Sequence, residues 1–239
     1  LVIVFFGFYT IVNFNPADVK KIEIAQSNNS KVNNIKKELT ILSWNIGYAG
    51  MGEDMDYFTD GGDRNNPTKD ESKDNFARIK RYLNSKKADF YLLQEVDKDS
   101  KRSYSINQYK QIQNIFKKYH SSYALNYSNP YVPYPFQDPI GKVKAGLATF
   151  AKYDPISARR LDLPGNYKWP KNLFHLDRCM LEMKFSYQDK KIVLINTHNS
   201  AFDKGDLKKK QMNYIKNKAI EEYKKGNYVV IGGDWNMLF

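Results

Sequence analysis

The stretch YVVIGGDWN, residues 228–236, decides which fold the sequence predicts. Its apolar, β-branched run predicts a buried strand, and the two glycines that follow allow the backbone to turn sharply at the strand end. Asp234 and Asn236 come next, so a charged acceptor and a neutral amide stand two residues apart and can point the same way. Such a pair suits a metal-bound or phosphate-bound oxygen. A capped turn is the alternative, because Asp and Asn are common turn residues.

Three further apolar strands end in a polar side chain that could take part in chemistry. LTILSWNI releases Asn45, ADFYLLQEV ends with Glu95, and a hairpin that turns at Gln188 and Asp189 ends in His198. Sites in α/β sheets lie beyond the strand ends. Each of these residues alone is more often structural, but together with Asp234 they predict a shared site.

Amphipathic spacing predicts helices over 69–86, 105–119 and 206–225. Residues 129–144 contain four prolines among aromatic residues, with Lys142 and Lys144 at the end. We expect neither helix nor strand ladder there, and the loop suits either a substrate surface or packing on itself.

The composition fits one large globular domain with an anionic partner. The 239 residues are 41% hydrophobic, and the formal net charge is +12. The charge favours nucleic acid, phospholipid headgroups or another phosphate ester, although a general bias towards Lys, Asn, Ile and Tyr would also produce it. Cys179 is the single cysteine, which excludes an intrachain disulfide and a cysteine-ligated zinc site.

The N-terminal region divides into a hydrophobic and a polar segment. Residues 1–14 begin LVIVFFGFYTIV, which is shorter than the roughly 20 apolar residues of a bilayer span but fits an export signal or an anchor remnant. A buried core strand is the alternative. Residues 15–38 predict a polar linker or a loosely docked arm, and 39–239 the domain itself. An exported or membrane-anchored, extracytoplasmic protein is therefore favoured over a cytoplasmic one.

Four motifs carry a resemblance to a known family. LSWNIGYAG, LLQEVD, INTHNSAFD and IGGDWNM resemble, in order and spacing, motifs of the endonuclease/exonuclease/phosphatase superfamily, which includes deoxyribonuclease I. Together with MDYFTDGG and LDRCMLEMKF they are similar to an uncharacterised bacterial branch of it. The resemblance implies an α/β fold, a four-layer α/β sandwich in which two mixed β-sheets pack face to face with helices outside. It also implies divalent-metal-dependent hydrolysis of phosphate esters.

The resemblance also implies roles for the metal ligands and the catalytic groups. Asn45 and Glu95 match the residues that hold the metal, Mg²⁺ with Mn²⁺ as the alternative, and oxygen ligands suit such a hard cation. His198 matches the histidine that donates to a phosphoryl oxygen. Asp234 and Asn236 match the pair that orients the attacking water and stabilises the transition state.

Arg178 and Asn199 are assigned to substrate binding. The fork of donors on Arg178 suits a phosphate, and a structural ion pair is the alternative for this residue.

One departure from the family concerns the general base. The family ends in a Ser-Asp-His-like motif, whereas the histidines here are His120, His175 and His198, and none follows Asp234. We therefore expect a sandwich that is incomplete at the C-terminus and inactive as 39–239 alone.

The expected function is that of a monomeric phosphodiesterase, nuclease or phosphatase that uses in-line attack by water. The alternative is a non-catalytic module that binds phosphate, lipid or nucleic acid on the same fold.

Overall fold

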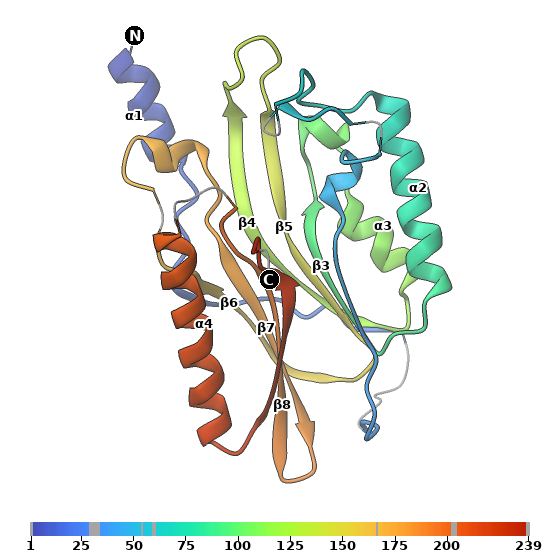
Figure 1. Ribbon diagram of the computed structural model, residues 1–239. Coiled ribbons are helices and arrows are strands. Elements are labelled where there is room, and N and C mark those ends of the chain that lie inside the picture. The colour runs from blue at the N-terminus through green and yellow to red at the C-terminus, as the bar shows by residue number, and fades with distance from the viewer. Residues whose placement is uncertain are drawn as a thin grey trace.

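The elements of the computed structural model lie in four layers, two helical and two of sheet (Figure 1). The structure describes residues 2–28, 34–53, 55–58, 61–165, 167–201 and 205–237. Its helices are α1 Val2–Val12, α2 Lys69–Ser85, α3 Gln108–Ile115 and α4 Asp206–Lys224, with 3₁₀ turns η1 Gly47–Ala49, η3 Lys101–Ser103 and η4 Lys171–Phe174. Its strands are β1 Val19–Lys21, β2 Ile41–Asn45, β3 Phe90–Asp97, β4 His120–Val132, β5 Gly141–Ala151, β6 Pro155–Asp162, β7 Cys179–Tyr187, β8 Lys190–His198 and β9 Tyr228–Asp234.

Two mixed sheets form the centre of the described chain. One has the order β1-β6-β7-β8-β9 and the other β2-β3-β5-β4. The β2–β3 and β8–β9 pairs are parallel, and the remaining pairs are antiparallel. Buried side chains of α2 and α3 pack on the outer face of the second sheet, and those of α4 pack on the first. The predicted four-layer α/β sandwich is confirmed.

Apolar side chains of both sheets fill the space between them. Phe90 and Leu92 of β3 belong to one buried cluster with Leu181 and Phe185 of β7. Tyr91 points the other way, into the cluster beneath α2 and α3. β3 is apolar on both faces because both are covered, as the unbroken hydrophobic run of its sequence predicts.

The helices begin and end where local chemistry directs them. Thr68 and Glu71 form a capping box at the start of α2, which places its buried side chains on the sheet. α2 and α4 agree with their predicted ranges within one residue. α3 is shorter than the predicted 105–119, since Tyr104 and Ser105 have positive φ angles of 53° and 56° that a helix cannot contain.

The prediction that 129–144 contains no strand ladder was wrong. β4 continues to Val132 and β5 begins at Gly141, and the two strands pair at Asn129↔Val143 and Val132↔Gly141. β4 is an edge strand, where a proline such as Pro130 is tolerated because no inner ladder bond depends on its missing N–H. Only the hairpin tip, residues 133–140, connects the strands as a loop.

The N-terminal segments pack on the domain. α1 occupies most of the predicted signal or anchor segment, and the hydroxyl of its buried Tyr9 donates to the Tyr131 carbonyl at 2.6 Å. Within 15–38, for which the sequence predicts a polar linker, β1 adds an edge strand to β6. No helix in the described ranges is long and apolar enough to cross a bilayer. Export or anchoring stays a prediction.

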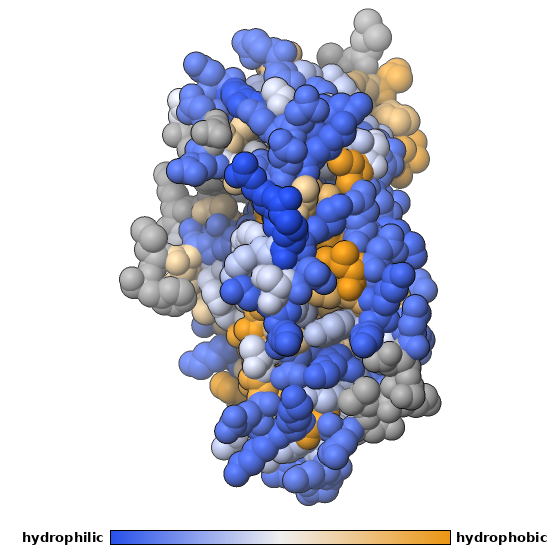
Figure 2. Space-filling model, turned by 90° about the vertical axis from the view of Figure 1, so that its right-hand side faces the viewer, coloured by the Kyte–Doolittle hydropathy of each residue, from blue (hydrophilic) through white to orange (hydrophobic). Residues whose placement is uncertain are grey.

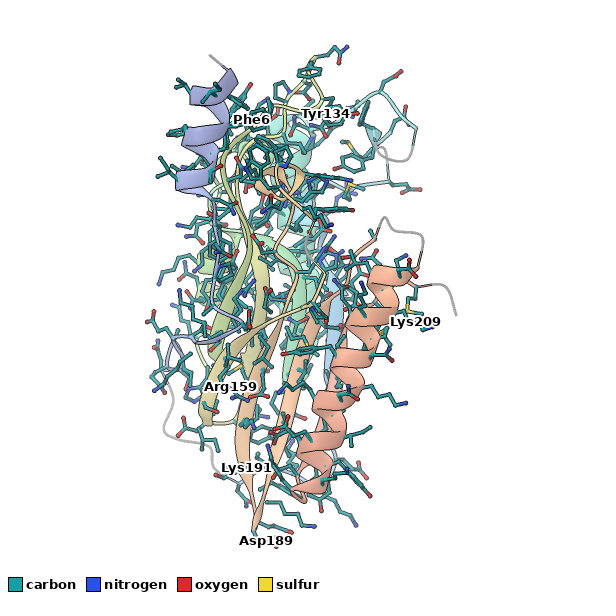
Figure 3. The ribbon with its side chains drawn as sticks, turned by 90° about the vertical axis from the view of Figure 1, so that its left-hand side faces the viewer. Phe6, Tyr134, Arg159, Asp189, Lys191 and Lys209 are labelled. Atoms are coloured by element: carbon teal, nitrogen blue, oxygen red, sulfur yellow. The ribbon has the colours of Figure 1, made fainter. Side chains whose placement is uncertain are left out.

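A view of the surface and a view of the side chains show how the ends of the molecule differ. The face seen in Figure 2 is predominantly hydrophilic, with small hydrophobic areas. In Figure 3, Phe6 of α1 and Tyr134 of the hairpin tip lie at one end, and Asp189 of the β7–β8 turn lies at the other.

A buried amide joins the two sheets. Asn196 of β8 donates through Nδ2 to the carbonyls of Leu93 and Ala148 in the opposite sheet, each at 3.1 Å. Its Oδ1 accepts from Gln94 Nε2 at 2.7 Å. These bonds lie where the β3–β5 register shifts between Leu93 and Val96, so Asn196 provides donors at an interruption in the ladder.

Replacing this amide should destabilise the fold. Asn196→Ala would leave buried carbonyls unpaired, at about 1–3 kcal/mol for each such group, and we expect the free energy of unfolding in urea to fall by about 2 kcal/mol or more. The matched control is Asn217→Ala, on the exposed face of α4, which should not destabilise because alanine favours helix. An Asn196→Ala protein as stable as the wild type would contradict this role.

Candidate active site

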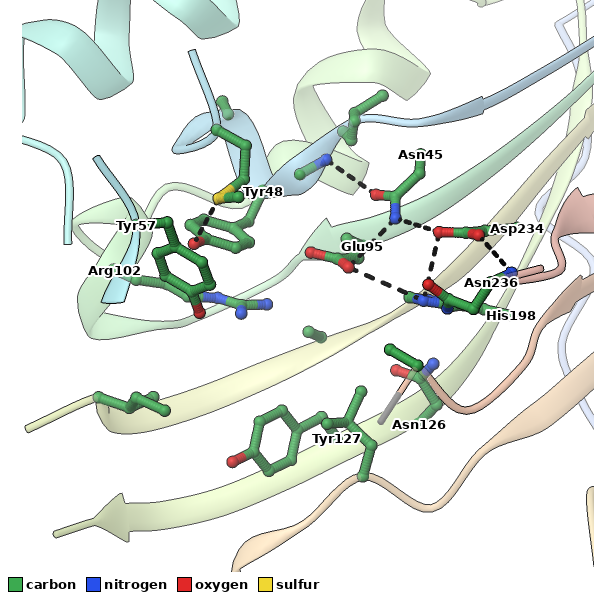
Figure 4. A pocket seen from close by; sticks show the side chains of 18 of the residues that line it. Asn45, Tyr48, Tyr57, Glu95, Arg102, Asn126, Tyr127, His198, Asp234 and Asn236 are labelled. Atoms are coloured by element: carbon green, nitrogen blue, oxygen red, sulfur yellow. Dashed lines mark hydrogen bonds and ion pairs between the residues drawn. The ribbon is translucent and has the colours of Figure 1, made fainter. Parts of the chain in front are cut away.

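The four predicted strand ends converge on one large pocket (Figure 4). The parallel pair β2–β3 from one sheet and the parallel pair β8–β9 from the other direct their carboxyl ends into it. Its volume is about 1290 Å³. Six of the seven predicted site residues line it: Asn45, Glu95, Arg178, His198, Asp234 and Asn236.

The glycine pair before Asp234 allows close packing rather than a turn. β9 continues through both glycines to Asp234, so the predicted sharp turn before this residue is wrong. A Cβ on Gly232 would lie 2.8 Å from Leu92 Cδ1 of the facing sheet, and one on Gly233, where φ is +146°, would lie 2.0 Å from the Thr197 carbonyl oxygen. Only glycine lets β9 approach both neighbours this closely.

Glu95 reaches the pocket because β3 contains a bulge. The register shift between Leu93 and Val96, together with the positive φ of 53° at Glu95, interrupts the alternation of side chains. Gln94 is therefore buried between the sheets, and the Glu95 carboxylate is 26% exposed in the pocket. Bulges redirect side chains in this way next to active sites.

Asn45 connects the two carboxylates. Its Nδ2 donates to Glu95 Oε1 at 3.2 Å and to Asp234 Oδ2 at 2.7 Å. Its Oδ1 accepts from the backbone N–H of Gly47 at 3.0 Å. His198 lies beside the same pair, with Nε2 3.8 Å from Glu95 Oε1 and 3.6 Å from Asp234 Oδ2.

Asp234, Asn236 and Asn199 support one another. The Asn236 N–H donates to Asp234 Oδ1 at 2.9 Å, and Asn236 Nδ2 donates to the Asn199 carbonyl at 2.8 Å. The Asn199 side chain is buried, accepting from Thr197 Oγ1 and donating to Met212 Sδ. Asn199 does not line the pocket, and it contacts Asn236 through its backbone carbonyl; its predicted part in substrate binding stays a prediction.

Two nitrogen atoms beside the carboxylates lack partners. His198 Nδ1 and Arg178 Nη1 are buried, and neither has a hydrogen-bond partner in the described ranges. Burial, assisted by Arg178 and Arg102, lowers the pKa of His198 well below its usual value. Burial also lowers the pKa of Arg178, opposed by Glu95 and Asp234, but a guanidinium stays protonated. The Arg178 guanidinium thus offers an N–H group to an anion, while the single N–H of a neutral His198 imidazole belongs at Nε2, beside the two carboxylates.

The residues present fit a divalent cation of the kind that the fold family implies. No three His, Cys, Asp or Glu side chains enclose a metal among the residues described. Mg²⁺ needs no such cage, because it usually binds through one or two carboxylates and keeps several waters. Glu95 supplies a carboxylate, and Asn45 Oδ1 has a second lone pair beyond the bond to Gly47.

Sequence reasoning missed several residues that line the pocket. Arg102 pairs with Asp97 through two hydrogen bonds and lies 3.8 Å from the Tyr48 ring centre. Tyr57 and Asn126 also reach the pocket. Tyr48 and Tyr57 belong to GYAG and MDYF. These motifs carry part of the family resemblance, which was the available signal. Arg102 lies in the family-like motif QEVDKDSKRSYSINQ, but its place in the pocket depends on how η3 folds back on β3.

The far part of the pocket is aromatic and apolar. It is lined by Tyr127, Val132, Tyr134, Phe174 and Leu176, from β4, the hairpin tip and the segment around η4. A phosphate group at the polar end would therefore leave room for a larger attached group on this side.

Comparison with known proteins identifies the family. Residues 42–238 match a family model that is described as Endonuclease/Exonuclease/phosphatase family. The chain belongs to this family. A search of the curated proteins gives no match.

Solved structures of this family share the fold at low sequence identity. The endonuclease/exonuclease/phosphatase from Beutenbergia cavernae has a TM-score of 0.58 and 18% identity, covering 83% of this chain and 47% of its own. ANGEL2, a 2',3'-cyclic phosphatase, has a TM-score of 0.57 and 18% identity, and the match covers 92% of this chain and 56% of ANGEL2. D. rerio TDP2, complexed with single strand DNA product, has a TM-score of 0.54 and 14% identity, and the match covers 85% of this chain and 63% of TDP2. The chain thus spans about half to two thirds of these structures.

Glu95 should control binding of a divalent cation. We expect Mn²⁺ to bind the protein and to be displaced by Mg²⁺. Its affinity for Glu95→Gln should be lower by at least roughly 10- to 100-fold, which is the cost of losing a residue that merely supports a metal ligand. Electron paramagnetic resonance of free Mn²⁺ measures both. Glu221→Gln, on the exposed face of α4, is the control and should bind like the wild type. Equal Mn²⁺ affinity in Glu95→Gln would show that the ligand assignment is wrong.

Proposed function

We propose that this protein is a divalent-metal-dependent phosphoester hydrolase whose active site is the pocket at the four strand ends. One observation carries the proposal: the carboxylates of Glu95 and Asp234, the His198 imidazole and the Arg178 guanidinium line one pocket. Glu95 and Asp234 supply negative charge for a cation, while His198 and Arg178 supply donors for an anion. A phosphate ester with a divalent cation satisfies both halves of the site.

Each side chain then has a defined part in hydrolysis. A bound Mg²⁺ would polarise the phosphoryl group and stabilise the leaving oxygen. His198 and Arg178 donate to the non-bridging phosphoryl oxygens, where negative charge accumulates in the transition state. Asp234 accepts a hydrogen bond from the attacking water, and the Asn236 N–H holds the carboxylate in place at 2.9 Å.

The size and lining of the pocket favour an ester with a large organic group. A pocket of about 1290 Å³ exceeds the needs of a phosphate, and ligand sites bury the apolar part of a ligand against apolar walls. Family neighbours act on different phosphoesters, as the names 2',3'-cyclic phosphatase and single strand DNA product indicate. We therefore propose phosphodiesters with an aromatic or apolar substituent as the preferred substrate class.

The direct test is turnover of the complete gene product with Mg²⁺ on a panel of plasmid DNA, sphingomyelin vesicles, bis-p-nitrophenyl phosphate and p-nitrophenyl phosphate. Asp234→Asn should lower kcat by about 10²- to 10⁴-fold, because a neutral amide is a weaker acceptor than a carboxylate for the hydrogen bond that orients the attacking water. KM should change little, since Asp234 does not hold the ester. Asp206→Asn, in the first turn of α4, is the control.

Two outcomes would contradict the proposal. If no member of the panel is hydrolysed but phosphate esters still bind the pocket, the protein is a binding module on the same fold. If turnover occurs but Asp234→Asn retains it, catalysis takes place elsewhere.

A further inference from the structure

One end of the molecule carries an exposed apolar surface that the proposed reaction does not use. It consists of α1, the hairpin tip 133–140 and Trp169, and we call it the apolar end. On α1, Ile3 is 87% exposed and Ile11 85%, and at the tip Phe136 is 81% exposed. Figure 3 places Phe6 and Tyr134 together at this end, and Figure 2 shows hydrophobic atoms gathered at its upper right edge.

Within the apolar end, α1 packs against Trp169 and the hairpin tip packs on itself. The Phe6 ring lies 5.7 Å from the ring of Trp169, whose Nε1 donates to Thr10 Oγ1 at 3.2 Å. At the tip, Tyr134 packs edge-on against Phe136, with ring centres 6.2 Å apart. These contacts fix the backbone and leave the outward side chains of α1 and the tip uncovered.

We propose that the apolar end docks the protein onto the surface of a lipid bilayer. None of the 11 residues of α1 is charged. Its exposed side chains include Ile3, Val4 and Ile11, and their transfer from water into the bilayer is favourable because it buries apolar surface.

The residues around α1 match the chemistry of a bilayer interface. Trp169 is 60% exposed, and Tyr131 and Tyr134 are also exposed. Trp and Tyr concentrate at headgroup level because their rings are apolar and their tips are polar. Lys168 and Lys171, on either side of the Trp169–Pro170 pair, are exposed and add attraction to anionic headgroups.

A bilayer accounts for this surface better than a second copy of the chain. Docking between two proteins requires complementary shape and paired polar groups, whereas α1 and the tip are separate protrusions with few polar groups. Insertion into lipid needs no such complementarity, since the hydrophobic effect is non-directional. The carboxylate of Asp138 at the tip is paired with Lys101 at 3.1 Å, which reduces its repulsion from anionic lipid.

The docking surface adjoins the apolar part of the active-site pocket. Tyr134 of the tip lines that pocket, as does Lys171 at the start of η4. Docking would therefore bring the aromatic side of the pocket to the membrane surface. The binding test below involves no turnover, so its result is independent of the proposed hydrolase activity.

The experiment is co-sedimentation of the complete gene product with phosphatidylcholine vesicles, with and without phosphatidylglycerol. We expect binding to both, stronger with phosphatidylglycerol, and a loss of about ten-fold or more in the partition coefficient for Ile3→Ser/Ile11→Ser and for Phe136→Ser. The control is Tyr223→Ser on α4, because Tyr223 is also exposed, at 75%, but lies in the last turn of α4. It should bind like the wild type.

Three results would overturn the proposal. The first is no sedimentation with either vesicle. The second is sedimentation that the α1 and tip variants leave unchanged. The third is a concentration-dependent dimer in light scattering that the same variants disperse while vesicles are not bound, which would assign the surface to a second copy.

Discussion

The amide of Asn196 is the contact on which the site depends, because it joins the two sheets where the β3 ladder is interrupted. Donation to the Leu93 and Ala148 carbonyls satisfies backbone groups next to the bulge. The bulge in turn separates Gln94, which is buried against Asn196, from Glu95, which enters the pocket. In a regular strand without the bulge, Gln94 would still point between the sheets, but Glu95 would point to the opposite face and not into the pocket.

The site is organised by sign of charge. The Asn45 amide donates to the carboxylates of Glu95 in β3 and Asp234 in β9, and the His198 imidazole and the Arg178 guanidinium line the same pocket. Burial makes unpaired N–H groups costly, so a site of this kind sacrifices stability in order to be ready for an anion. The lowered pKa of His198 follows from the same burial.

The sequence predicted what apolar runs and strand ends encode. It located Asn45, Glu95, His198 and Asp234 at one site, because buried strands are continuous hydrophobic runs and polar residues at their ends stand out. It could not predict the bulge, since no local pattern distinguishes Gln94 from Glu95.

β6 and β1 escaped notice because charged residues occupy them. Arg159 and Arg160 of β6 form ion pairs with Glu182 of β7 and with Asp162, respectively, and the Glu182 partner is known only once the sheet has formed. The placement of Asn199 likewise depends on Met212 of α4, a tertiary neighbour.

The central claim, that the pocket binds a divalent cation and a phosphate together, is tested most directly by a crystal structure with Mn²⁺ and phosphate. It predicts an anomalous peak about 2.1 Å from a Glu95 oxygen and phosphate against His198 and Arg178; a peak or phosphate found only outside the pocket would contradict it.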